Sequence, residues 1–466
     1  MSLLERKINI WTLTLAGLAV YLAGRLMWGG MIVATMRDLV IAGFAIVTVL
    51  ISAQAFFFLY LILYAWNEPD TIEKNKSPKR LIEPRFSFTA LLPARHEEAV
   101  IGETIAAIAN IDYPEEMKEL LVLVRGDDRE TLEAAQRVMD TLGRENIKLV
   151  VVNDTPVNKP NQLNWGLYRA KNEVVAIFDA EDQPHPDIYK IVNTVMVREG
   201  TDVVQSGVQL VNYRSSWFAA FNVLEYYFWF KSALHFFARQ GVVPLGGNTV
   251  FFKRVWLNRA GGWDEKCLTE DAEIGIRLSK MGARIAVVYD EEHATAEETP
   301  VTLSALVRQR TRWNMGFLQV LGRGEWKGLP KWNQRILTGY LLVLPEILVG
   351  VLLVAPILAW AGAVYGLGIP LAMFSYVPLG LLIMQLVVAV TGMWQFTRDY
   401  KLIFPWWMGP MLVAGFWPYI VILAIGALRA VWRLVVGNLM WEKTTHVNAH
   451  RVDGLGYAGV RYGEMG

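Results

Sequence analysis

The feature that most constrains this chain is a set of long stretches without a single charged side chain. Residues 39–64, 347–397 and 402–428 contain no Asp, Glu, Lys or Arg. A helix needs about 20 mostly apolar residues to cross a bilayer, and a soluble core helix of this length and uniformity is very unusual. Only 19% of the 466 residues are charged, whereas soluble proteins average about 25%. The sequence therefore predicts an integral membrane protein.

Charge and cysteine content exclude several other classes. The formal net charge is +1, and no block of like charges is long enough to be a nucleic-acid arm. We therefore expect no nucleic-acid partner. Cys267 is the only cysteine, which excludes an internal disulfide and a thiolate metal site; we interpret it as a packing residue. The histidines are scattered and are assigned no metal.

The distribution of charge divides the chain into four parts. These are two N-terminal membrane helices in residues 1–66 (about 8–29 and 39–65), a charged soluble domain in 67–330, a C-terminal membrane bundle in 331–437, and a polar tail in 438–466. The linker after the second helix carries Lys74, Lys76, Lys79 and Arg80. Basic residues beside a membrane helix favour the cytosolic side. We therefore expect a multi-pass protein of the plasma membrane with its soluble domain in the cytosol.

The number of spans conflicts with the charges at the end of the chain. Ile336–Gly366, Pro370–Phe396 and Leu402–Leu428 are candidate spans, which would place the tail outside the cell. The basic residues Arg429, Arg433, Lys443 and Arg451 favour a cytosolic tail instead. One apolar segment must then be re-entrant, interfacial or split in two. Leu402–Leu428 contains three prolines and is the candidate.

The soluble part alternates strands with helices. Expected strands are Phe86–Leu92, Glu119–Val124, Lys148–Val152 and Val174–Phe178, and expected helices are Glu97–Ile108, Arg129–Thr141 and Asn161–Ala170. This alternation is typical of an α/β domain with a mostly parallel sheet, whose ligands bind beyond the carboxyl ends of the strands. The aromatic segment Trp217–Phe237 is too polar to span a membrane comfortably, and we expect an amphipathic helix at the interface.

Three carboxylates follow the last of these strands, in Asp179-Ala180-Glu181-Asp182. Hard divalent cations prefer carboxylate oxygens, and a departing nucleoside diphosphate needs its charge neutralised. The alternative is a helix start whose acids complement the helix dipole. The following Pro184 and Pro186 favour a rigid loop, and the segment is a candidate metal site.

A second acidic cluster, Thr269-Glu270-Asp271, precedes an amphipathic helix. Asp271 is a candidate general base that accepts the proton of an attacking hydroxyl. The alternative is a capping box with Thr269 as the cap and acids in the first turn. Both interpretations are compatible if they apply to different residues of the trio.

A third motif is Gln309-Arg310-Thr311-Arg312-Trp313. Gln309, Arg312 and Trp313 share one face of a helix, where Arg312 can pair with a phosphate and Trp313 can stack on a sugar. The alternative is an anchor at the membrane interface. Lys159 lies at a loop-to-helix junction, from which it can reach a phosphate; otherwise it is a surface lysine.

Taken together, these motifs resemble those of the processive membrane glycosyltransferases of family 2, the group of cellulose, hyaluronan, curdlan and mannan synthases. The resemblance covers about residues 88–320. The matching residues are Pro93-Ala94-Arg95-His96-Glu97-Glu98, Asp127-Asp128, Lys159-Pro160, Asp179-Ala180-Glu181-Asp182, Thr269-Glu270-Asp271 and Gln309-x-x-Arg312-Trp313. It implies a GT-A-type domain inserted between membrane helices.

The resemblance also implies roles for individual residues. For the donor, Ala94, Arg95 and Glu97 would line the nucleotide-base pocket, Asp127 or Asp128 would hold the base or ribose, and Lys159 would approach the phosphates. Asp179 with Glu181 or Asp182 would bind Mg²⁺ or Mn²⁺. Asp271 beside Glu270 would be the general base, and Gln309, Arg312 and Trp313 would bind the diphosphate and acceptor. The third position of the usual Asp-x-Asp motif is here Glu181, followed by Asp182. Which of the two binds the metal stays open.

The polar tail matches as well. Trp441–His446 resembles an element that covers the active site in relatives, which makes Lys443 and His446 candidate lid residues; a basic membrane-proximal tail is the alternative. The implied partners are a nucleotide-sugar donor, a UDP-sugar before a GDP-sugar, and a glycan or lipid acceptor.

Three hypotheses on function follow. The first is an inverting, processive synthase that secretes its glycan, the second is transfer of one sugar to a lipid, and the third is a transporter or scaffold that carries a soluble domain. Acidic clusters at several strand ends disfavour the third. Gln309–Trp313 favours the first, because that element accompanies polymer synthesis in the family.

Overall fold

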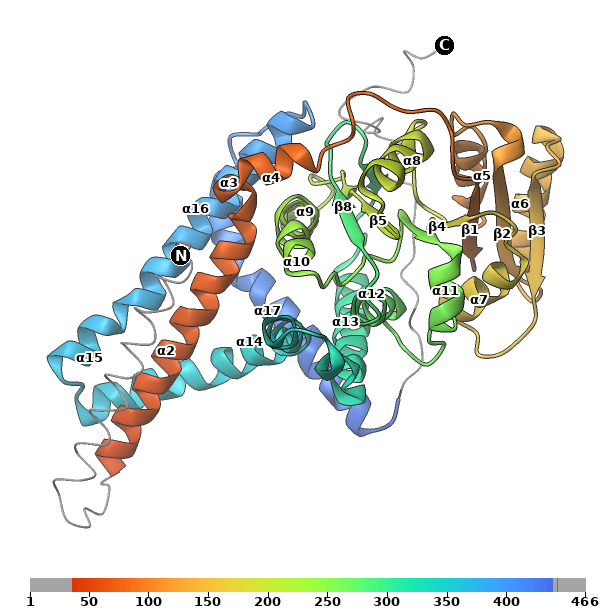
Figure 1. Cartoon of the computed structure of the whole chain (residues 1–466). Helices are drawn as coiled ribbons and strands as arrows, with labels where there is room; N and C mark the ends of the chain where they lie inside the picture. The colour runs from red at the N-terminus through yellow and green to blue at the C-terminus, as the bar shows by residue number, and fades with distance from the viewer. Residues whose placement is uncertain (1–35, 439–441, 443–466) are drawn as a thin grey trace. The chain divides into compact units, whose positions relative to one another are not determined.

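Strands and helices alternate through the central part of the chain, as the sequence predicts. The computed structural model describes residues 36–438 and residue 442 (Figure 1). Its strands are β1 Phe88–Ala94, β2 Lys118–Arg125, β3 Ile147–Val152, β4 Val174–Ile177, β5 Val203–Ser206, β6 Val208–Leu210, β7 Val250–Lys253, β8 Ile285–Val288 and β9 Thr295–Glu297. The helices among them are α5 Ile101–Ala109, α6 Arg129–Leu142, α7 Lys159–Arg169, α8 Ile188–Glu199, α9 Trp217–Phe228, α10 Leu234–Gln240, α11 Arg254–Ala260 and α12 Glu270–Lys280.

Seven of the strands form one sheet in the order β3-β2-β1-β4-β7-β5-β8. Only β7 runs against its neighbours, β4 and β5, so the sheet is mostly parallel. Phe88 of β1 pairs with Lys118 of β2 on one side and with Val174 of β4 on the other. After β1 the chain adds β2 and β3 on one side and then returns to place β4 on the other side. The strand order therefore reverses beside β1, and ligands of such sheets bind beyond the strand ends at this switch point.

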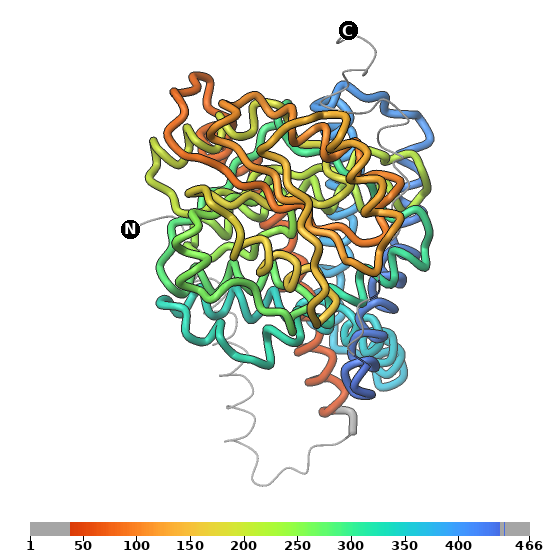
Figure 2. Tube along the Cα trace, turned by 90° about the vertical axis from the view of Figure 1, so that its right-hand side faces the viewer, coloured from red at the N-terminus to blue at the C-terminus, as the bar shows by residue number. Residues whose placement is uncertain are grey.

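The two faces of the sheet bury different side chains, because successive residues of a strand point to opposite sides. Phe88, Ala90 and Leu92 of β1 belong to a core that includes residues of α5 and α8. Leu91 faces the other way, into a core that includes residues of α7 and α9. Figure 2 shows the orange and yellow segments of this α/β part lying together, as they do in Figure 1.

The aromatic segment from Trp217 onward is helical, as we expect, and its position at a membrane interface stays a prediction. It forms α9, one π-helical turn (Trp229–Ala233) and α10 without interruption. Most of its residues are buried within the protein, and nearly all of the others are half-buried. Its residues Phe221 and Phe228 share a core with Leu412 and Tyr419, which lie on α17 (Met408–Val435). The segment is thus held by protein on most sides.

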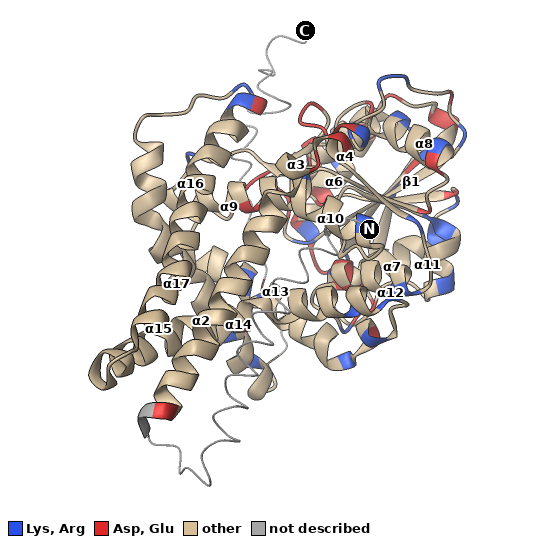
Figure 3. Ribbon diagram, turned by 60° about the vertical axis from the view of Figure 1, so that its left-hand side comes forward, with Lys and Arg blue, Asp and Glu red and all other residues tan. Residues whose placement is uncertain are grey.

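Among the described residues, four helices are long and apolar enough to cross a membrane. They are Asp38–Ile62 of α2 (Met36–Ile62), α14 (Trp332–Tyr365), Ile369–Asp399, which comprises α15 (Ile369–Phe374) and α16 (Tyr376–Asp399), and α17. Charged side chains are sparse on them and gather on the sheet domain (Figure 3). Within the described residues, one compact unit comes from the stretches 36–53 and Val351–Pro378, and the other from Gln54–Gly350 and 379–438.

These helices agree with four of the expected spans, and the expected helix at 8–29 lies outside the described residues. The segment Leu402–Leu428 is not split in two by its prolines. Pro405 precedes α17, Pro410 lies in its first turn, where a missing N–H breaks no helical hydrogen bond, and Pro418 lies inside the helix. A re-entrant or interfacial position for this segment stays a prediction.

Candidate active site

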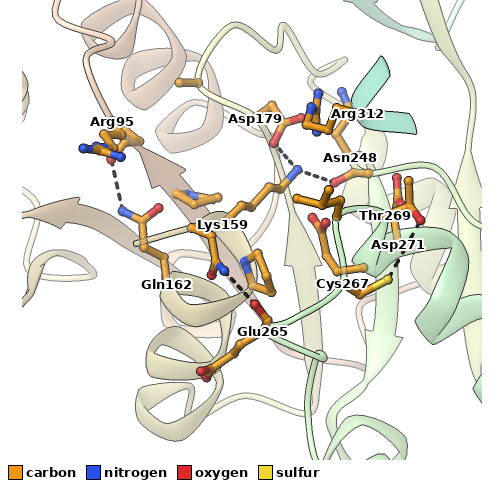
Figure 4. Close-up of a pocket in the computed structure, with 18 of the residues that line it drawn as sticks. Arg95, Lys159, Gln162, Asp179, Asn248, Glu265, Cys267, Thr269, Asp271 and Arg312 are labelled. Atoms are coloured by element: carbon orange, nitrogen blue, oxygen red, sulfur yellow. Dashed lines mark hydrogen bonds and ion pairs between the residues drawn. The ribbon is translucent and has the colours of Figure 1, made fainter. Parts of the chain in front are cut away.

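A cavity of about 800 Å³ opens beyond the carboxyl ends of β1 and β4, in the larger unit. Most of the residues singled out in the sequence line it, together with residues of α9, α12 and α13 (Leu303–Arg323) (Figure 4). The expected residues in its wall are Ala94, Arg95, Glu97, Lys159, Asp179, Glu181, Glu270, Asp271, Gln309, Arg312 and Trp313. Sites of this size and position in α/β proteins bind ligands.

Hydrogen bonds to Asp128 and Thr131, which lie 32 and 34 residues further along the chain, fix the backbone of the loop after β1. His96 adopts a left-handed backbone conformation, with φ of +56°, and its N–H donates to the Asp128 carboxylate. The next N–H, of Glu97, donates to Thr131 Oγ1 at 2.9 Å. A strained φ persists only where surrounding contacts fix it. These contacts keep Arg95 at the cavity, and its buried Nε has no hydrogen-bond partner in the part of the chain that the structure describes.

Asp127 and Asp128 do not line the cavity. Asp128 is almost fully buried and caps α6, because its carboxylate accepts the N–H of Thr131. The Asp127 side chain is exposed, and a hydrogen bond from Arg125 lowers its pKa. Asp128 therefore stabilises the backbone of the loop that carries Arg95 without lining the cavity itself. A contact of either aspartate with base or ribose stays a prediction.

The acidic turn after β4 divides its carboxylates between two tasks. Asp182 is fully buried, accepts the N–H of Asp179 at 2.9 Å, and takes a second hydrogen bond from Asn248 at 2.6 Å. It does not line the cavity, whereas Asp179 and Glu181 do. The segment does not start a helix, because α8 begins only at Ile188, so the helix-start alternative does not apply. Asp182 holds the turn, and the ligand-binding interpretation fits Asp179 and Glu181.

Lys159 is the first residue of α7 and crosses the cavity to the acidic turn. Asn158 caps the helix by accepting the N–H of Asn161. The Lys159 ammonium pairs with Asp179 and donates to the Gly247 carbonyl at 2.8 Å (Figure 4). Burial opposes its charge, but Asp179, Glu270 and Asp271 outweigh burial and raise its pKa. Lys159 is thus a largely buried cation in the cavity wall, and not the open-surface lysine of the alternative interpretation.

Thr269 is not the capping residue that the alternative interpretation requires, since its side chain makes no cap hydrogen bond to α12. Its Oγ1 instead packs on Gly316 of α13, where a Cβ would lie 2.4 Å from it. Glycine therefore allows α13 to contact the start of α12 directly. This close approach brings Asp271 and Gln309 to one cavity.

Glu270 and Asp271 both line the cavity from the first turn of α12. Burial, followed by the charge of Asp271, raises the pKa of Glu270 to about 7. Burial also raises the pKa of Asp271, opposed by the Ala272 N–H, Lys159 and Arg312. A carboxylate with a raised pKa is a stronger base while it remains ionised near neutral pH.

Gln309, Arg312 and Trp313 face the cavity from α13, and the membrane-anchor alternative does not fit their position. The Oε1 of Gln309 and the Nε of Arg312 are buried and have no hydrogen-bond partner within the described residues. Buried polar atoms are normally paired. Their lack of partners, like that of the Arg95 Nε, indicates that a polar ligand completes this wall.

Arg310 was not singled out in the sequence, yet it fixes the Trp313 ring. It pairs with Glu225, donates to Asn222 at 2.5 Å, and its guanidinium lies 4.5 Å from the Trp313 ring centroid. Tyr419 of α17 donates to the same Glu225 carboxylate at 3.0 Å. The stack of α9, α13 and α17 thus orients Trp313 from behind.

Glu297 and Tyr226 are among the cavity residues that the sequence does not indicate, because they lie far along the chain from the motifs. Glu297 ends β9, and Tyr226 is one of many aromatic residues in α9. Burial, followed by the charges of Glu181 and Asp182, holds the pKa of Glu297 well above its usual value. Only the bridge between Gln183 and Ala296, which joins the acidic turn to β9, reveals this proximity.

The donor set at this corner suits a hard divalent cation, because Asp179, Glu181 and Glu297 offer only carboxylate oxygens. Within residues 36–438 and 442, no group of three His, Cys, Asp or Glu side chains could hold a metal ion by itself. Mg²⁺ usually takes one or two carboxylates and completes its shell with water and substrate phosphates. The corner therefore fits a metal that arrives with a diphosphate.

The candidate lid residues Lys443 and His446 lie outside the described residues. Their neighbour Glu442 is described and forms paired hydrogen bonds of 2.7 Å with Arg429. It also lies 2.9 Å from Arg433. A single carboxylate is thus shared by two of the basic residues at the end of α17, Arg429 and Arg433.

Comparison with known proteins points in one direction. The chain is 26% identical over 281 residues to "Probable glycosyltransferase YdaM" of Bacillus subtilis and 29% identical over 244 residues to "Beta-monoglucosyldiacylglycerol synthase" of Nostoc sp.. It is 26% identical over 265 residues to "Poly-beta-1,6-N-acetyl-D-glucosamine synthase" of Staphylococcus epidermidis. These matches cover 57%, 51% and 55% of this chain, and 64%, 50% and 60% of the three relatives.

The fold agrees with a solved structure, the mannosyltransferase PcManGT of Pyrobaculum calidifontis in complex with GDP-Man and Mn²⁺. The TM-score is 0.56 with 19% identity, over 84% of this chain and 99% of that one. At this identity the likeness shows the fold alone, a GT-A-like α/β domain. The model of the family described as "Glycosyltransferase like family 2" matches residues 84–316, which contain the cavity motifs. The chain belongs to glycosyltransferase family 2.

Proposed function

We propose that this protein is a membrane glycosyltransferase that moves a hexosyl group from a nucleotide sugar to the hydroxyl of a glycan or lipid. One observation carries the proposal. A single cavity joins a largely buried lysine, two acids at a helix start, and three polar atoms of Arg95, Gln309 and Arg312 that have no partner within the described residues. These groups match the needs of a diphosphate leaving group and a nucleophilic hydroxyl.

The proposed reaction is a single displacement that inverts the sugar carbon. The acceptor oxygen forms a bond to the anomeric carbon, while the bond from that carbon to the diphosphate oxygen breaks. Asp271 accepts the proton of the acceptor hydroxyl, and the nucleoside diphosphate leaves. Lys159 and Arg312 hold the growing negative charge on the leaving group. No second carboxylate nucleophile is required.

A divalent cation, Mg²⁺ or Mn²⁺, fits the corner formed by Asp179 and Glu181 and would neutralise diphosphate charge when bound. Both carboxylates line the cavity, whereas the buried Asp182 holds the turn. This division supports Glu181 over Asp182 as the second ligand. Asp179 also orients Lys159 through their ion pair.

For the donor, we propose a UDP-sugar such as UDP-glucose before a GDP-sugar. The resemblance to family 2 synthases supports this choice. Ala94, Arg95 and Glu97 line one end of the cavity and are proposed to hold the base. Hydrolysis of a panel of nucleotide sugars by the purified protein tests the choice; turnover of GDP-sugars alone would overturn it.

For the acceptor, we propose a growing β-glycan that is extended processively and secreted. The cavity position of Gln309, Arg312 and Trp313 supports this, because the family's polymer synthases carry that element. Three relatives named beta-monoglucosyldiacylglycerol synthases support a lipid acceptor as the second candidate. A labelled donor decides between them: products of many lengths support the polymer, and one single-sugar glycolipid supports the lipid.

We further propose a plasma-membrane protein whose catalytic domain lies in the cytosol, where nucleotide sugars are made. The four apolar helices support membrane insertion. The basic linker between α2 and β1 supports the orientation. We expect a cysteine placed at Lys79 to be protected from an impermeant thiol reagent in intact cells. The same cysteine should be labelled after permeabilisation.

A further inference from the structure

A second cavity, of about 320 Å³, lies away from the active-site cavity and has no role in the proposed reaction. Its walls come from residues 71–78, from the end of α8, from α10, and from β8. Residues 71–78 include the end of α4 (Pro69–Lys74), which follows α2 through the short helix α3 (Tyr64–Asn67). The cavity is therefore built against the linker that leaves the first described membrane-type helix.

A buried histidine lines this cavity with one nitrogen unused. His235 of α10 is 1% exposed, and its Nδ1 lies 3.0 Å from the side-chain nitrogen of Asn75. With that amide as the donor, Nδ1 accepts and the ring proton lies on Nε2. The Nε2 has no hydrogen-bond partner within the described residues. Burial lowers the pKa of His235 to about 4, so the ring is neutral and Nε2 is an unpaired donor.

The charged residues around the cavity are mostly cationic. Lys74, Lys76, Arg198 and Arg239 line it against one acid, Glu199. Lys76 pairs with Glu73 at 3.2 Å, and Arg239 pairs with Glu68 at 3.0 Å. Among the described residues, Lys74 and Arg198 have no carboxylate partner within 4.0 Å, although Arg198 donates to the Arg80 carbonyl at 2.6 Å. Asp290 and Glu291 also act on Lys76. Lys74 and Arg198 are therefore the cations of this site that no described carboxylate pairs with directly.

The backbone contributes further polar groups. β8 is the edge strand of the seven-stranded sheet, so one side of its backbone pairs with no other strand among the described residues. Residues Ile285–Val288 of this strand line the cavity. The aromatic rings of Tyr60, Tyr64 and Phe236 pack on one another beside it, between α2 and α10. Aromatic side chains gather where a membrane helix reaches the headgroups.

We propose that this second cavity is a binding site for a phosphate group, carried by an anionic lipid headgroup. Lys74 and Arg198 supply charge-assisted contacts, and His235 Nε2–H donates the hydrogen bond that it otherwise lacks. The position of the cavity directly after α2 and α3 places it where a headgroup is available. A soluble phosphate ester has the same chemistry and is the other source of the ligand.

The test uses the detergent-purified full chain and short-chain lipids below their micelle concentration. Dihexanoyl phosphatidylglycerol, dihexanoyl phosphatidylcholine and inorganic phosphate are titrated separately, and binding is followed by calorimetry. The test variants are Lys74→Ala and Arg198→Gln, which remove cavity charge at exposed positions, and His235→Phe, which keeps the ring and removes the donor. Lys79→Ala is the matched control: Lys79 lies in the same linker, its side chain is 90% exposed, and it does not line the cavity.

We expect phosphatidylglycerol to bind the wild type and Lys79→Ala equally well. Each cavity variant should weaken that binding about tenfold or more, because a hydrogen bond to a charged group contributes about 1.5–3 kcal/mol. Stronger binding of inorganic phosphate than of the lipid, with the same sensitivity to the variants, supports the site and identifies a soluble ligand. Equal loss in Lys79→Ala, or no binding of either phosphatidylglycerol or phosphate, overturns the proposal. Equal binding of phosphatidylcholine, whose phosphate charge is balanced by choline, overturns the assignment to an anionic headgroup. Because the readout is binding, the result does not depend on sugar transfer.

Discussion

The active-site cavity has two halves that are built differently. The half that includes Arg95 and Asp179 lies at the ends of β1 and β4, where neighbouring strands hold the backbone on both sides. The half that includes Asp271 and Trp313 is carried by α12 and α13, which pack on each other through Thr269 and Gly316. We refer to these as the sheet half and the helix half.

The difference concerns what each half is connected to. The sheet half is enclosed by the α/β domain, so its geometry is set without the apolar helices. The helix half continues through Arg310 and Glu225 to Tyr419 on α17. We infer that the sheet half handles the soluble donor, whereas the helix half positions an acceptor that comes from, or leaves through, the membrane-type helices.

The largest effect is expected from Asp271→Asn in the helix half. Loss of the proposed base should lower kcat about 10²–10⁴-fold, because general-base catalysis typically contributes this much. The Kd of the donor should stay within about threefold of the wild type, measured by calorimetry with the unreacted nucleotide sugar. The control is Asp264→Asn, an acid outside the cavity wall that pairs with Arg323. Normal turnover by Asp271→Asn would remove Asp271 from the base role.

The second prediction concerns the sheet half. Asp179→Ala should weaken metal-dependent donor binding by about tenfold to a hundredfold, because it removes a proposed metal ligand and the partner of Lys159. Donor binding is measured with and without added Mg²⁺. In the wild type the metal should strengthen binding, and in the variant this gain should vanish. A donor affinity that is unchanged in Asp179→Ala contradicts the assignment.

The third prediction separates positioning from chemistry. Arg310→Lys keeps the charge but loses the flat guanidinium that stacks on Trp313. We expect about a tenfold loss of transfer to the acceptor, with shorter products if the enzyme is processive. Donor hydrolysis by water should be unaffected, since the sheet half is untouched. Arg308→Lys on the same helix, outside the cavity wall, is the control. An equal loss of hydrolysis and transfer would argue against separate halves.

The smallest effect is expected in the pH dependence. Burial raises the pKa of both Glu270 and Asp271, and that of Glu270 to about 7. The active base must be ionised, so kcat/KM should fall on the acid side of neutrality. Glu270→Gln removes a neighbouring negative charge, which lowers the pKa of the remaining acid. The acid limb of the pH–rate profile should therefore move to lower pH by about one unit or less. A shift to higher pH would contradict this coupling.

The sequence predicts much of the sheet half because local patterns are sufficient there. An apolar run followed by acids indicates both a buried strand and the position where it ends, and this identifies Asp179 from local sequence. Lys159 is a candidate from local sequence as well, because it lies where a loop meets a helix. The same reasoning cannot separate Asp182 from Glu181. A carboxylate that caps its own turn and one that faces a ligand carry the same sequence signature.

The helix half shows where local reasoning ends. Arg310 is one position in a motif whose outer residues point into the cavity, and its role depends on Glu225, which is 85 residues away. The bridge between Gln183 and Ala296 brings Glu297 to the site, and no sequence pattern predicts that pairing. Pairing across such distances depends on how helices and strands pack, and packing is not periodic in the sequence.

By itself, the sequence determined the apolar spans, the strand–helix alternation and the residue types of the site, because hydrophobicity and periodicity act locally. The tertiary structure alone decided which carboxylates face the cavity, which hold the backbone, and which arginine orients Trp313. It also created the second cavity, because residues from α4, α8, α10 and β8 meet only in the fold. Hydrogen bonds and ion pairs form between neighbours in space, and the fold chooses those neighbours.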